Sequence, residues 1–525
     1  MKRALNSDCV NTMFDRPPVW AFVILALSLF SAHGSTQTVF VDANYGGCPG
    51  SGTPADPFCS IQTAIAAASS GGTVSVAPGT YFENIDFLGK DIVVVSQQGP
   101  EVTIIDGGNG VVATVTFQNN ETSATRLEGF TVQNGRGGIS CFQASPTIED
   151  NIVTSNVFLS GVRCVSGSPV IRGNTISYNT GTIGNAGGIY CAASSAFISN
   201  NLIEHNTGRY GGGISCRSGT PTITTNRIID NTATDVGGGG VFLRTSEALV
   251  INNEIVRNSA TTGGGLYSWG LPSSTLINNT ITENSATVLG GGLYSLDATT
   301  SVSNSIFWDN GVNAIRRVGG SISIAYSNIE GGYAGPGNLN SNPLFLDPGA
   351  SDFRLSCGSP CVGSADQTVT VLLPDFDREG RDLRAIGALD IGADELGTLW
   401  SLNGSPVPGG APIYFEAVSA PELAGDVTEV YVSLGEGKSF GGLPVPGSGG
   451  RRLFLDNDLL FAVWLGLPSP LRQVNLSGCT PAGTFPFTIP PNVVSGLKIY
   501  FASITWDLPS GAVASVPLPQ TITIQ

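Results

Sequence analysis

A repeat of about 25 residues runs from residue 128 to residue 330 and constrains the fold more than any other feature. Most units contain the pattern Asn-x-Ile/Val-x-x-Asn, and the clearest units continue into Gly-Gly-Ile/Leu-Tyr. The leading asparagines of successive units are Asn151, Asn174, Asn201, Asn226, Asn253, Asn279, Asn304 and Asn328. Because a unit this short cannot bury an apolar face alone, the units must stack on one another.

Three further columns of residues keep the same period. The first aliphatic column is Val153, Ile176, Ile203, Ile228, Ile255, Ile281 and Ile306. The second aliphatic column is Ile139, Val162, Ile189, Ile214, Val241, Leu266 and Leu293. The trailing asparagines are Asn156, Asn179, Asn206, Asn231, Asn258, Asn284 and Asn310.

The segments around these columns are short, β-branched and interrupted by Gly or Asn, which is typical of brief strands joined by turns. We therefore predict an all-β chain folded as a parallel β-helix, in which equivalent residues lie about 4.8 Å apart in parallel sheets. The aliphatic columns are expected to form the core. The asparagines are expected to hydrogen-bond in ladders and to take the left-handed backbone conformation at tight corners.

These coils resemble those of the right-handed parallel β-helix proteins, the pectate-lyase-like superfamily. The strings NNEIVRNSATTGGGLY and NNTITENSATVLGGGLY also resemble repeats of polymorphic outer-membrane and autotransporter-type adhesins. Residues 60–85 resemble the superfamily's amino-terminal cap and first coil, and residues 341–361 and 375–395 resemble the closing segment of secreted bacterial β-helix proteins. The resemblance is specific for fold but not for chemistry, because this fold carries lyases, hydrolases, esterases, epimerases and adhesins.

The predicted cap includes one helix with a single apolar face, which would close the open end of the core. The residues of that face are Ile61, Ala64, Ile65 and Ala68.

The chain divides into three predicted parts. Residues 1–34 form a secretory signal peptide, since the charge-free run from Val19 to Phe30 is shorter than the roughly 20 apolar residues of a membrane-spanning helix. Residues 35–395 form the β-helix, and residues 396–525 alternate short apolar runs with Pro- and Gly-rich turns, which predicts a small β-sandwich. Within the β-helix the cap and first coil span 35–90, the clear coils 128–330 and the closing segment 341–395.

Composition excludes several classes of protein. Only 12% of residues are charged against 41% hydrophobic, which argues against disorder. The formal charge is −16, and −17 once the leader with its three basic and two acidic residues is removed, so nucleic acid is an unexpected partner. No transmembrane segment is expected after signal cleavage, because no second long apolar run exists. His205 is then the single histidine. Any Ser- or Cys-nucleophile triad, and any zinc site built on histidines, would therefore have to use it.

Eight of the ten cysteines fall into two groups, while Cys9 lies in the leader and Cys479 has no evident mate. The close pairs Cys48–Cys59 and Cys357–Cys361 are expected to be disulfides at the two ends of the helix, as in a secreted protein. Four cysteines lie two residues after the second aliphatic column and point inward in successive coils: Cys141, Cys164, Cys191 and Cys216. Neighbours in this stack fall within disulfide range, but their side chains point the same way, so we favour a reduced buried ladder over two bridges.

The candidate binding surface is the set of outward positions beside the second aliphatic column. Its residues are Arg163, Tyr190, Arg217, Phe242, Arg244, Tyr267, Trp269 and Tyr294. Aromatic faces can stack on sugar rings, and arginine holds carboxylates or sulfates bidentately, so we predict an exposed glycan-binding strip. The alternative is that the aromatic rings pack on one another or lie beneath other segments.

Two other sets of polar residues carry weaker signals. One column is expected to face solvent as a ladder of weak ion pairs, and it contains Tyr178, His205, Asp230, Arg257 and Glu283. Asp375, Asp377 and Glu379 have the carboxylate spacing of half a calcium loop, which suggests either a structural calcium ion or a solvated turn.

The leading hypothesis is a secreted or cell-surface, adhesin-like scaffold that binds a polysaccharide or another cell-surface component. The predicted leader and the adhesin-like repeats favour it, as does the lack of the motifs that the superfamily's hydrolases and esterases use. The alternative is a polysaccharide lyase acting on an anionic glycan, with or without calcium, in which Arg163, Arg217 or Arg244 serves as base.

Overall fold

The computed structural model describes residues 37–366 except 109, 111, 183–185, 272 and 357, together with residues 368–369 and 389–394 and the strands after residue 398. Over these residues the chain is almost entirely β-structure, with one α-helix, α1 (Ile61–Ala67), and one 3-10 turn, Pro348–Ala350. The predicted parallel β-helix is confirmed.

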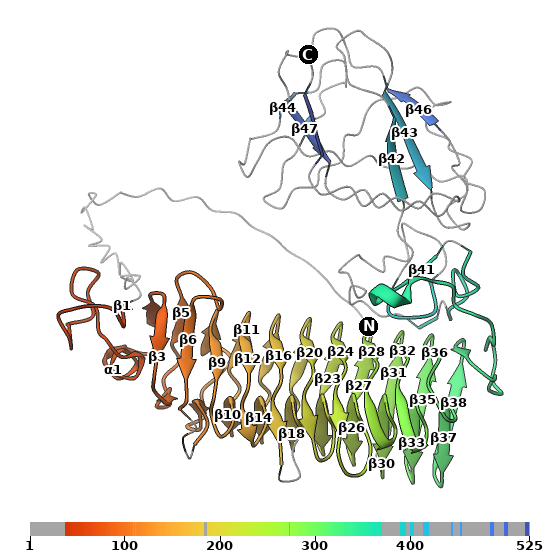
Figure 1. Ribbon diagram of the computed structural model, residues 1–525, viewed down its shortest axis with the longest axis horizontal. Coiled ribbons are helices and arrows are strands. Elements are labelled where there is room, and N and C mark those ends of the chain that lie inside the picture. Colours follow the sequence, from red (N-terminus) through yellow and green to blue (C-terminus); the bar gives the residue numbers. More distant parts are fainter. Residues whose placement is uncertain are drawn as a thin grey trace, which may run out of the picture. The chain divides into compact units, whose positions relative to one another are not determined.

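The coils stack three parallel sheets along the helix, and six of them add a strand of a fourth, as the coil from β10 (Ile139–Phe142) to β13 (Val157–Phe158) does. Figure 1 shows the stack of coils from the side. β10 belongs to sheet 1, which has ten strands, and β11 (Thr147–Glu149) to sheet 2, which has twelve. β12 (Ile152–Thr154) belongs to the eleven-stranded sheet 3, and β13 to the six-stranded sheet 4. The next strand, β14 (Val162–Val165), pairs in register with β10, so that equivalent residues of successive coils are neighbours.

Both aliphatic columns line the core. Every member of the second column, from Ile139 to Leu293, has at most 1% of its surface exposed. Helix α1 closes the amino-terminal end by burying Ile61, Ala64 and Ile65. Its ends are held by two charged side chains, because Glu83 accepts the Ile61 backbone N–H at 2.7 Å and Lys90 Nζ donates to the carbonyl of Ala68 at 2.9 Å.

The asparagine ladders form as predicted, and their side chains hydrogen-bond to buried backbone N–H and C=O groups at the corners of the coils. Asn231 is typical, because its Nδ2 donates to Ile203 O at 2.8 Å and to Asn258 Oδ1 at 3.0 Å. Its Oδ1 accepts the backbone N–H of Asn206 at 3.0 Å. The prediction that the ladder asparagines take the left-handed conformation is wrong, since the residue before each of them does so, as in Asp230 with φ 55°.

The repeat slips by one residue near the end of the helix, which corrects two predicted ladder positions. Ser305 replaces Asn304 in the ladder, because the backbone N–H of Asn279 donates to its Oγ at 3.1 Å, and Ser327 follows it instead of Asn328. Phe307 therefore pairs with Ile281 in the core column, and Ile306 turns to the outside of sheet 3. There it packs against Leu355, Cys361 and Ile391 of the closing segment.

The closing segment lies along the outer face of sheet 3. After β39 (Asn328–Ile329) it forms an antiparallel hairpin of β40 (Phe345–Asp347) and β41 (Asp352–Leu355). Phe353 packs on Ile229 and Val256, which point outward from sheet 3. Arg227 Nη2 donates to Ser351 O at 2.6 Å, which fixes the hairpin turn to a strand far earlier in the sequence.

The cysteines correct one of the two predicted disulfides. Cys48 and Cys59 are bonded, with Cα atoms 5.8 Å apart. Cys361 is instead a free, buried thiol that packs in the closing segment and contacts Asn328 Nδ2 at 3.2 Å, and its predicted mate Cys357 lies outside the described residues. Burial raises the pKa of Cys361 to about 11.

The four stacked cysteines are free and buried, as favoured above: Cys141, Cys164, Cys191 and Cys216. Hydrogen bonding to its two neighbours in the stack, together with burial, raises the pKa of the Cys164 thiol.

Several predictions fall on residues that the structure does not describe, namely the leader, the possible calcium ligands Asp375, Asp377 and Glu379, and most of the carboxyl-terminal domain. In that domain β42 (Leu399–Asn403), β43 (Ile413–Val418) and β46 (Thr484–Phe487) form one antiparallel sheet. The β-sandwich stays a prediction. Among the described residues, none of the helical structure is long and apolar enough to cross a membrane.

Replacing Asn231 by Ala tests the ladder. The change leaves the carbonyl of Ile203 and the amide of Asn206 buried without their partner, so the free energy of unfolding should fall by about 3 kcal/mol. Urea unfolding followed by circular dichroism measures this loss. Asn200→Gly is the control, because Asn200 lies outside the ladder and has φ 55°, which glycine accepts. A loss of less than about 1 kcal/mol for Asn231→Ala would contradict the role given to the ladder.

Acid should loosen the hairpin on sheet 3. Burial disfavours the Asp352 carboxylate, but its hydrogen bonds from Arg354 and the charges of Arg354 and Arg227 together lower its pKa. The stabilisation is therefore complete above the ordinary aspartate pKa of about 3.9 and is lost as pH falls through the lowered value. Hydrogen exchange of residues 345–355 should accelerate over that range.

In Asp352→Asn the backbone amides of residues 345–355 should already exchange about fivefold faster at neutral pH and lose the acid dependence, since the partly exposed ion pair with Arg354 contributes about 1 kcal/mol. Asp309→Asn, which removes an exposed carboxylate elsewhere, should behave as the unaltered protein does. Equal acid sensitivity in the unaltered protein and in Asp352→Asn would show that another group controls the hairpin.

Candidate functional site

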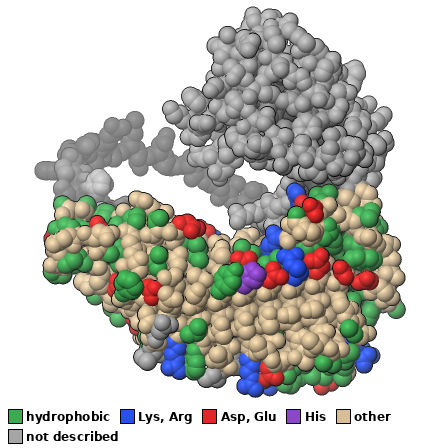
Figure 2. Space-filling model, in the orientation of Figure 1, with side chains coloured by type: hydrophobic (Ala, Val, Ile, Leu, Met, Phe, Trp, Pro, Cys, Tyr) green, Lys and Arg blue, Asp and Glu red, His purple; other side chains and the backbone are tan. Residues whose placement is uncertain are grey.

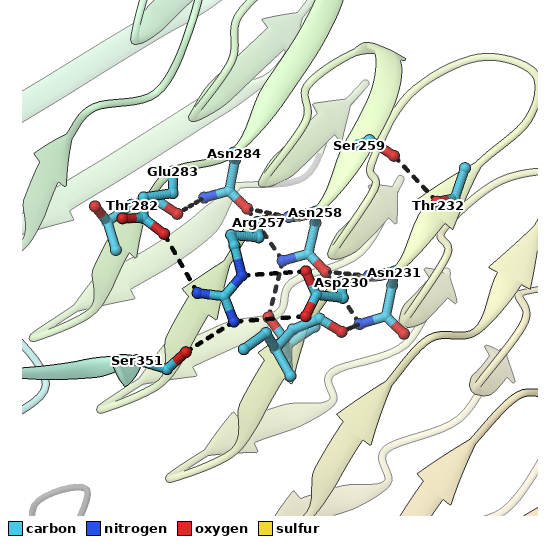
Figure 3. A network of polar contacts seen from close by, with 12 residues as sticks. Asp230, Asn231, Thr232, Arg257, Asn258, Ser259, Thr282, Glu283, Asn284 and Ser351 are labelled. Carbon is cyan, nitrogen blue, oxygen red and sulfur yellow. Dashed lines mark hydrogen bonds and ion pairs between the residues drawn. The ribbon is translucent and has the colours of Figure 1, made fainter. Parts of the chain in front are cut away.

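One charged column runs along the corner between sheets 3 and 4, where Figure 2 shows a histidine among acidic and basic side chains. The Tyr178 and His205 rings, both exposed, stack with centroids 5.1 Å apart. Arg257 lies between two carboxylates, with Nε 3.2 Å from Asp230 Oδ1 and Nη1 3.3 Å from Glu283 Oε2 (Figure 3). The predicted ladder is confirmed, except that Arg257 also donates to Ser351 Oγ at 2.9 Å and is thereby held against the closing hairpin.

Charges alternate in the other stacked columns as well. Arg227 Nε lies 3.4 Å from Glu254 Oε2 on the neighbouring coil. On sheet 2, Glu149 lies between Arg126, at 2.9 Å, and Arg172. Arg172 is directly opposite Glu149 in the sheet, which is a favourable pairing. On the other side Glu128 is opposite Glu149, and Arg126 contacts both carboxylates.

The outer face of sheet 1 departs from this rule. Its strands from β10 onward carry five arginines and no acidic residue: Arg163, Arg217, Arg244, Arg316 and Arg317. These strands are β10, β14, β18 (Ile189–Ala192), β22 (Ile214–Arg217), β26 (Val241–Arg244), β30 (Leu266–Trp269), β34 (Leu293–Leu296) and β37 (Ile315–Val318).

Two of the predicted binding residues are buried, which corrects the prediction of a fully exposed strip. Phe242 is 0% exposed and Tyr267 is 2% exposed. Tyr210, from the loop before β22, packs on Phe242 at 5.6 Å, and the Phe242 and Tyr267 rings meet edge to face at 5.3 Å. Gly237 lies against Tyr267 so closely, with φ 49°, that a Cβ there would be 2.0 Å from the ring. Burial raises the pKa of Tyr267 to about 12.

The accessible side chains on this face form a ledge, which combines second outward positions of three strands with Tyr190 and Tyr294 at the first outward position and Tyr210 from a loop. Arg217, Arg244 and Trp269 are register neighbours on β22, β26 and β30. The guanidinium of Arg244 lies 4.3 Å from the Trp269 ring centroid, and that of Arg217 lies 4.9 Å from the Tyr210 centroid. We call the accessible set the sheet 1 ledge, which consists of Tyr190, Tyr210, Arg217, Arg244, Trp269 and Tyr294.

Arg163 lies beside Tyr190 in register, so it extends the ledge toward the amino-terminal end. Tyr210 is the residue that the sequence analysis missed, because it belongs to a loop outside the strand period. The sequence does contain a hint, because Tyr210 belongs to the string Arg-Tyr-Gly-Gly-Gly directly before a sheet 1 strand.

Among the described residues, no three His, Cys, Asp or Glu side chains converge in a way that could hold a metal ion. The ledge therefore offers rings and guanidinium groups as its binding elements, with hydroxyl groups on Tyr190, Tyr210 and Tyr294.

Comparisons with known proteins bear on the fold. No curated protein shows a significant sequence match. Among solved structures, pectate lyase Pel9A is similar with a TM-score of 0.47 and 15% identity, over 69% of this chain and 97% of that one. XylC in complex with xylose has a TM-score of 0.43 and 12% identity, over 69% and 98% of the two chains. An alginate lyase from Paenibacillus sp. str. FPU-7 has a TM-score of 0.34 and 14% identity, over 58% and 99%.

The family model described as "Right handed beta helix region" matches residues 82–228, 113–281 and 224–337. These overlapping matches cover the stacked coils from β4 (Ile85–Asp86) to β39. Sequence and structure agree that this part of the chain is a right-handed parallel β-helix.

Proposed function

We propose that the chain is an exported, adhesin-like β-helix scaffold that binds a polysaccharide through the sheet 1 ledge. The observation that carries this proposal is the exposed Arg244 beside the half-buried Trp269 ring, on strands that lack acidic residues in a protein of charge −16. Aromatic faces provide apolar area for sugar rings, and an accessible apolar patch rimmed by polar groups is a common mark of a binding site.

The geometry of the ledge suits an extended polymer. Successive coils present Arg217, Arg244 and Trp269 in register, and parallel strands are spaced about 4.8 Å apart, which is close to the length of one pyranose unit. The side chains stand on strands rather than on loops and are braced by ring contacts, so binding requires little reordering.

Export is supported by two features of the chain. The apolar run from Val19 to Phe30 with basic residues before it has the form of a secretory signal. The Cys48–Cys59 disulfide suits an oxidising compartment. A surface scaffold needs both a route out of the cell and a fold that resists unfolding outside it.

Replacing Trp269 by Ala should weaken polysaccharide binding about tenfold, since a stacked ring is worth about 1 kcal/mol or more. The readout is retention on immobilised pectate, alginate, dextran and chondroitin sulfate, with Trp fluorescence as a solution measurement. Tyr178→Ala is the matched control, because it removes an exposed aromatic ring from a different face.

Two outcomes would contradict the proposal. One is that the unaltered protein is retained on none of the polymers, and the other is that Trp269→Ala binds as tightly as Tyr178→Ala. If the polymers are instead cleaved with release of an unsaturated product that absorbs in the near ultraviolet, the protein is a lyase and the scaffold proposal is replaced.

A further inference from the structure

Arg217 and Arg244 are a like-charged pair in direct opposition. They occupy the same outward position on β22 and β26, whose strands are neighbours in sheet 1. Their Cα atoms are thus separated by about one strand spacing, roughly 4.8 Å. Like charges placed directly opposite each other destabilise a sheet.

Like charges that oppose each other elsewhere are neutralised, as Glu128 and Glu149 on sheet 2 are by Arg126, which contacts both carboxylates. Arginines in the other stacked columns meet a carboxylate on the adjacent coil, as Arg257 meets Asp230 and Glu283. Among the described residues, neither Arg217 nor Arg244 has a carboxylate within ion-pair distance. The pair therefore differs from the like-charged pair Glu128 and Glu149 in having no neutralising partner among the described residues.

Both guanidinium groups are held by rings rather than by acids. Arg217 lies against Tyr210 at 4.9 Å and faces Tyr190 at 5.8 Å, while Arg244 lies on Trp269 at 4.3 Å. Stacking on a ring fixes the plane of a guanidinium and leaves its N–H donors free. The Nε of Arg217 is buried and has no hydrogen-bond partner among the described residues, which is a cost that an acceptor on a ligand would remove.

We propose that Arg217 and Arg244 form a clamp for one acidic group, a carboxylate or a sulfate ester, of the bound polysaccharide. The inference rests on the proposed function and specifies the ligand as an acidic glycan. Planar or tetrahedral oxyanions match the paired N–H donors of guanidinium, and one anion between the two coils neutralises the repulsion between them. Tyr210 and Trp269 are positioning residues for the clamp.

The clamp has a physical signature in the free protein. Without an anion the two cations repel, so an oxyanion at this point should stabilise the fold by mass action. The effect should shrink as ionic strength rises, because both guanidinium groups are partly solvent-exposed.

The experiment uses two matched pairs of polymers: pectate with its methyl ester, and dextran sulfate with dextran. In each pair the backbone is the same and only the acidic group differs, so the pairs also separate a carboxylate ligand from a sulfate ligand. The unaltered protein should bind at least one acidic polymer about tenfold more tightly than its neutral mate. Arg217→Gln should lose that preference while retaining the weaker binding to the neutral mate.

Arg172→Gln is the charge-matched control, because Arg172 is exposed but paired with Glu149 on sheet 2. It should keep the preference for the acidic polymer.

A second variant guards against a simple folding defect. Arg217→Glu places an opposite charge next to Arg244, so it should raise the melting temperature and abolish binding of the acidic polymer. A third measurement needs no polysaccharide, since sodium sulfate should raise the melting temperature of Arg172→Gln more than that of Arg217→Gln.

The outcomes separate the clamp from the proposed function. Equal binding of the acidic and neutral polymers, or an unchanged preference in Arg217→Gln, would overturn the clamp while leaving a ledge that binds polysaccharide through Trp269. Binding of none of the polymers would remove the proposed function. The sulfate measurement would then decide whether the arginine pair holds an oxyanion, and equal sulfate shifts in Arg172→Gln and Arg217→Gln would overturn it.

Discussion

The structure depends on amide groups that repeat at the spacing of the coils. At the corners of each coil the backbone leaves the strand ladder, and the Asn side chains supply the donors and acceptors that the corner lacks, as Asn206, Asn231 and Asn258 do in succession. Because every coil repeats the same bonds, the register of the backbone is fixed throughout the stack, and the outward positions are free to vary without disturbing it.

In-register stacking also imposes a condition on those outward positions. Each outward side chain lies between the equivalent side chains of the preceding and following coils. Cations must alternate with anions, or rings must pack on rings, as the Arg257 column and the Tyr267 cluster do. A column that places like charges on neighbouring coils is destabilised by their repulsion, and the fold itself does not require such a column. The pair Arg217 and Arg244 is such a place, which is why the candidate site lies there rather than at the better-satisfied charged column.

The period of the sequence was sufficient to predict the core columns, the ladders and the inward stack of cysteines, because all of these follow from residues that repeat. Helix α1 lies outside the repeat and was predicted from its apolar face and from the resemblance of the cap. The slip at Ser305 was missed, although Asn310 follows Asn304 by six residues where the earlier asparagine pairs are five apart. The contacts of Ile306 with Leu355 and Ile391, by contrast, involve residues outside the repeat. The sequence left open whether Phe242 and Tyr267 are exposed or pack on other rings, and the second alternative is correct for these two, because Tyr210 and Gly237 cover them from loops that lie outside the period.

The hairpin at residues 345–355 has a consequence for how such a chain can change in length. It is attached to sheet 3 at Arg227 and Phe353, several coils before the last strand, so the connecting chain must span a fixed number of coils between these two points. Coils inserted or deleted on the amino-terminal side of β24 (Arg227–Ile229) would leave that span intact. A coil inserted or deleted between β24 and β39 would instead break the contacts of the hairpin with sheet 3. Evolutionary growth of the stack is therefore expected to be one-sided.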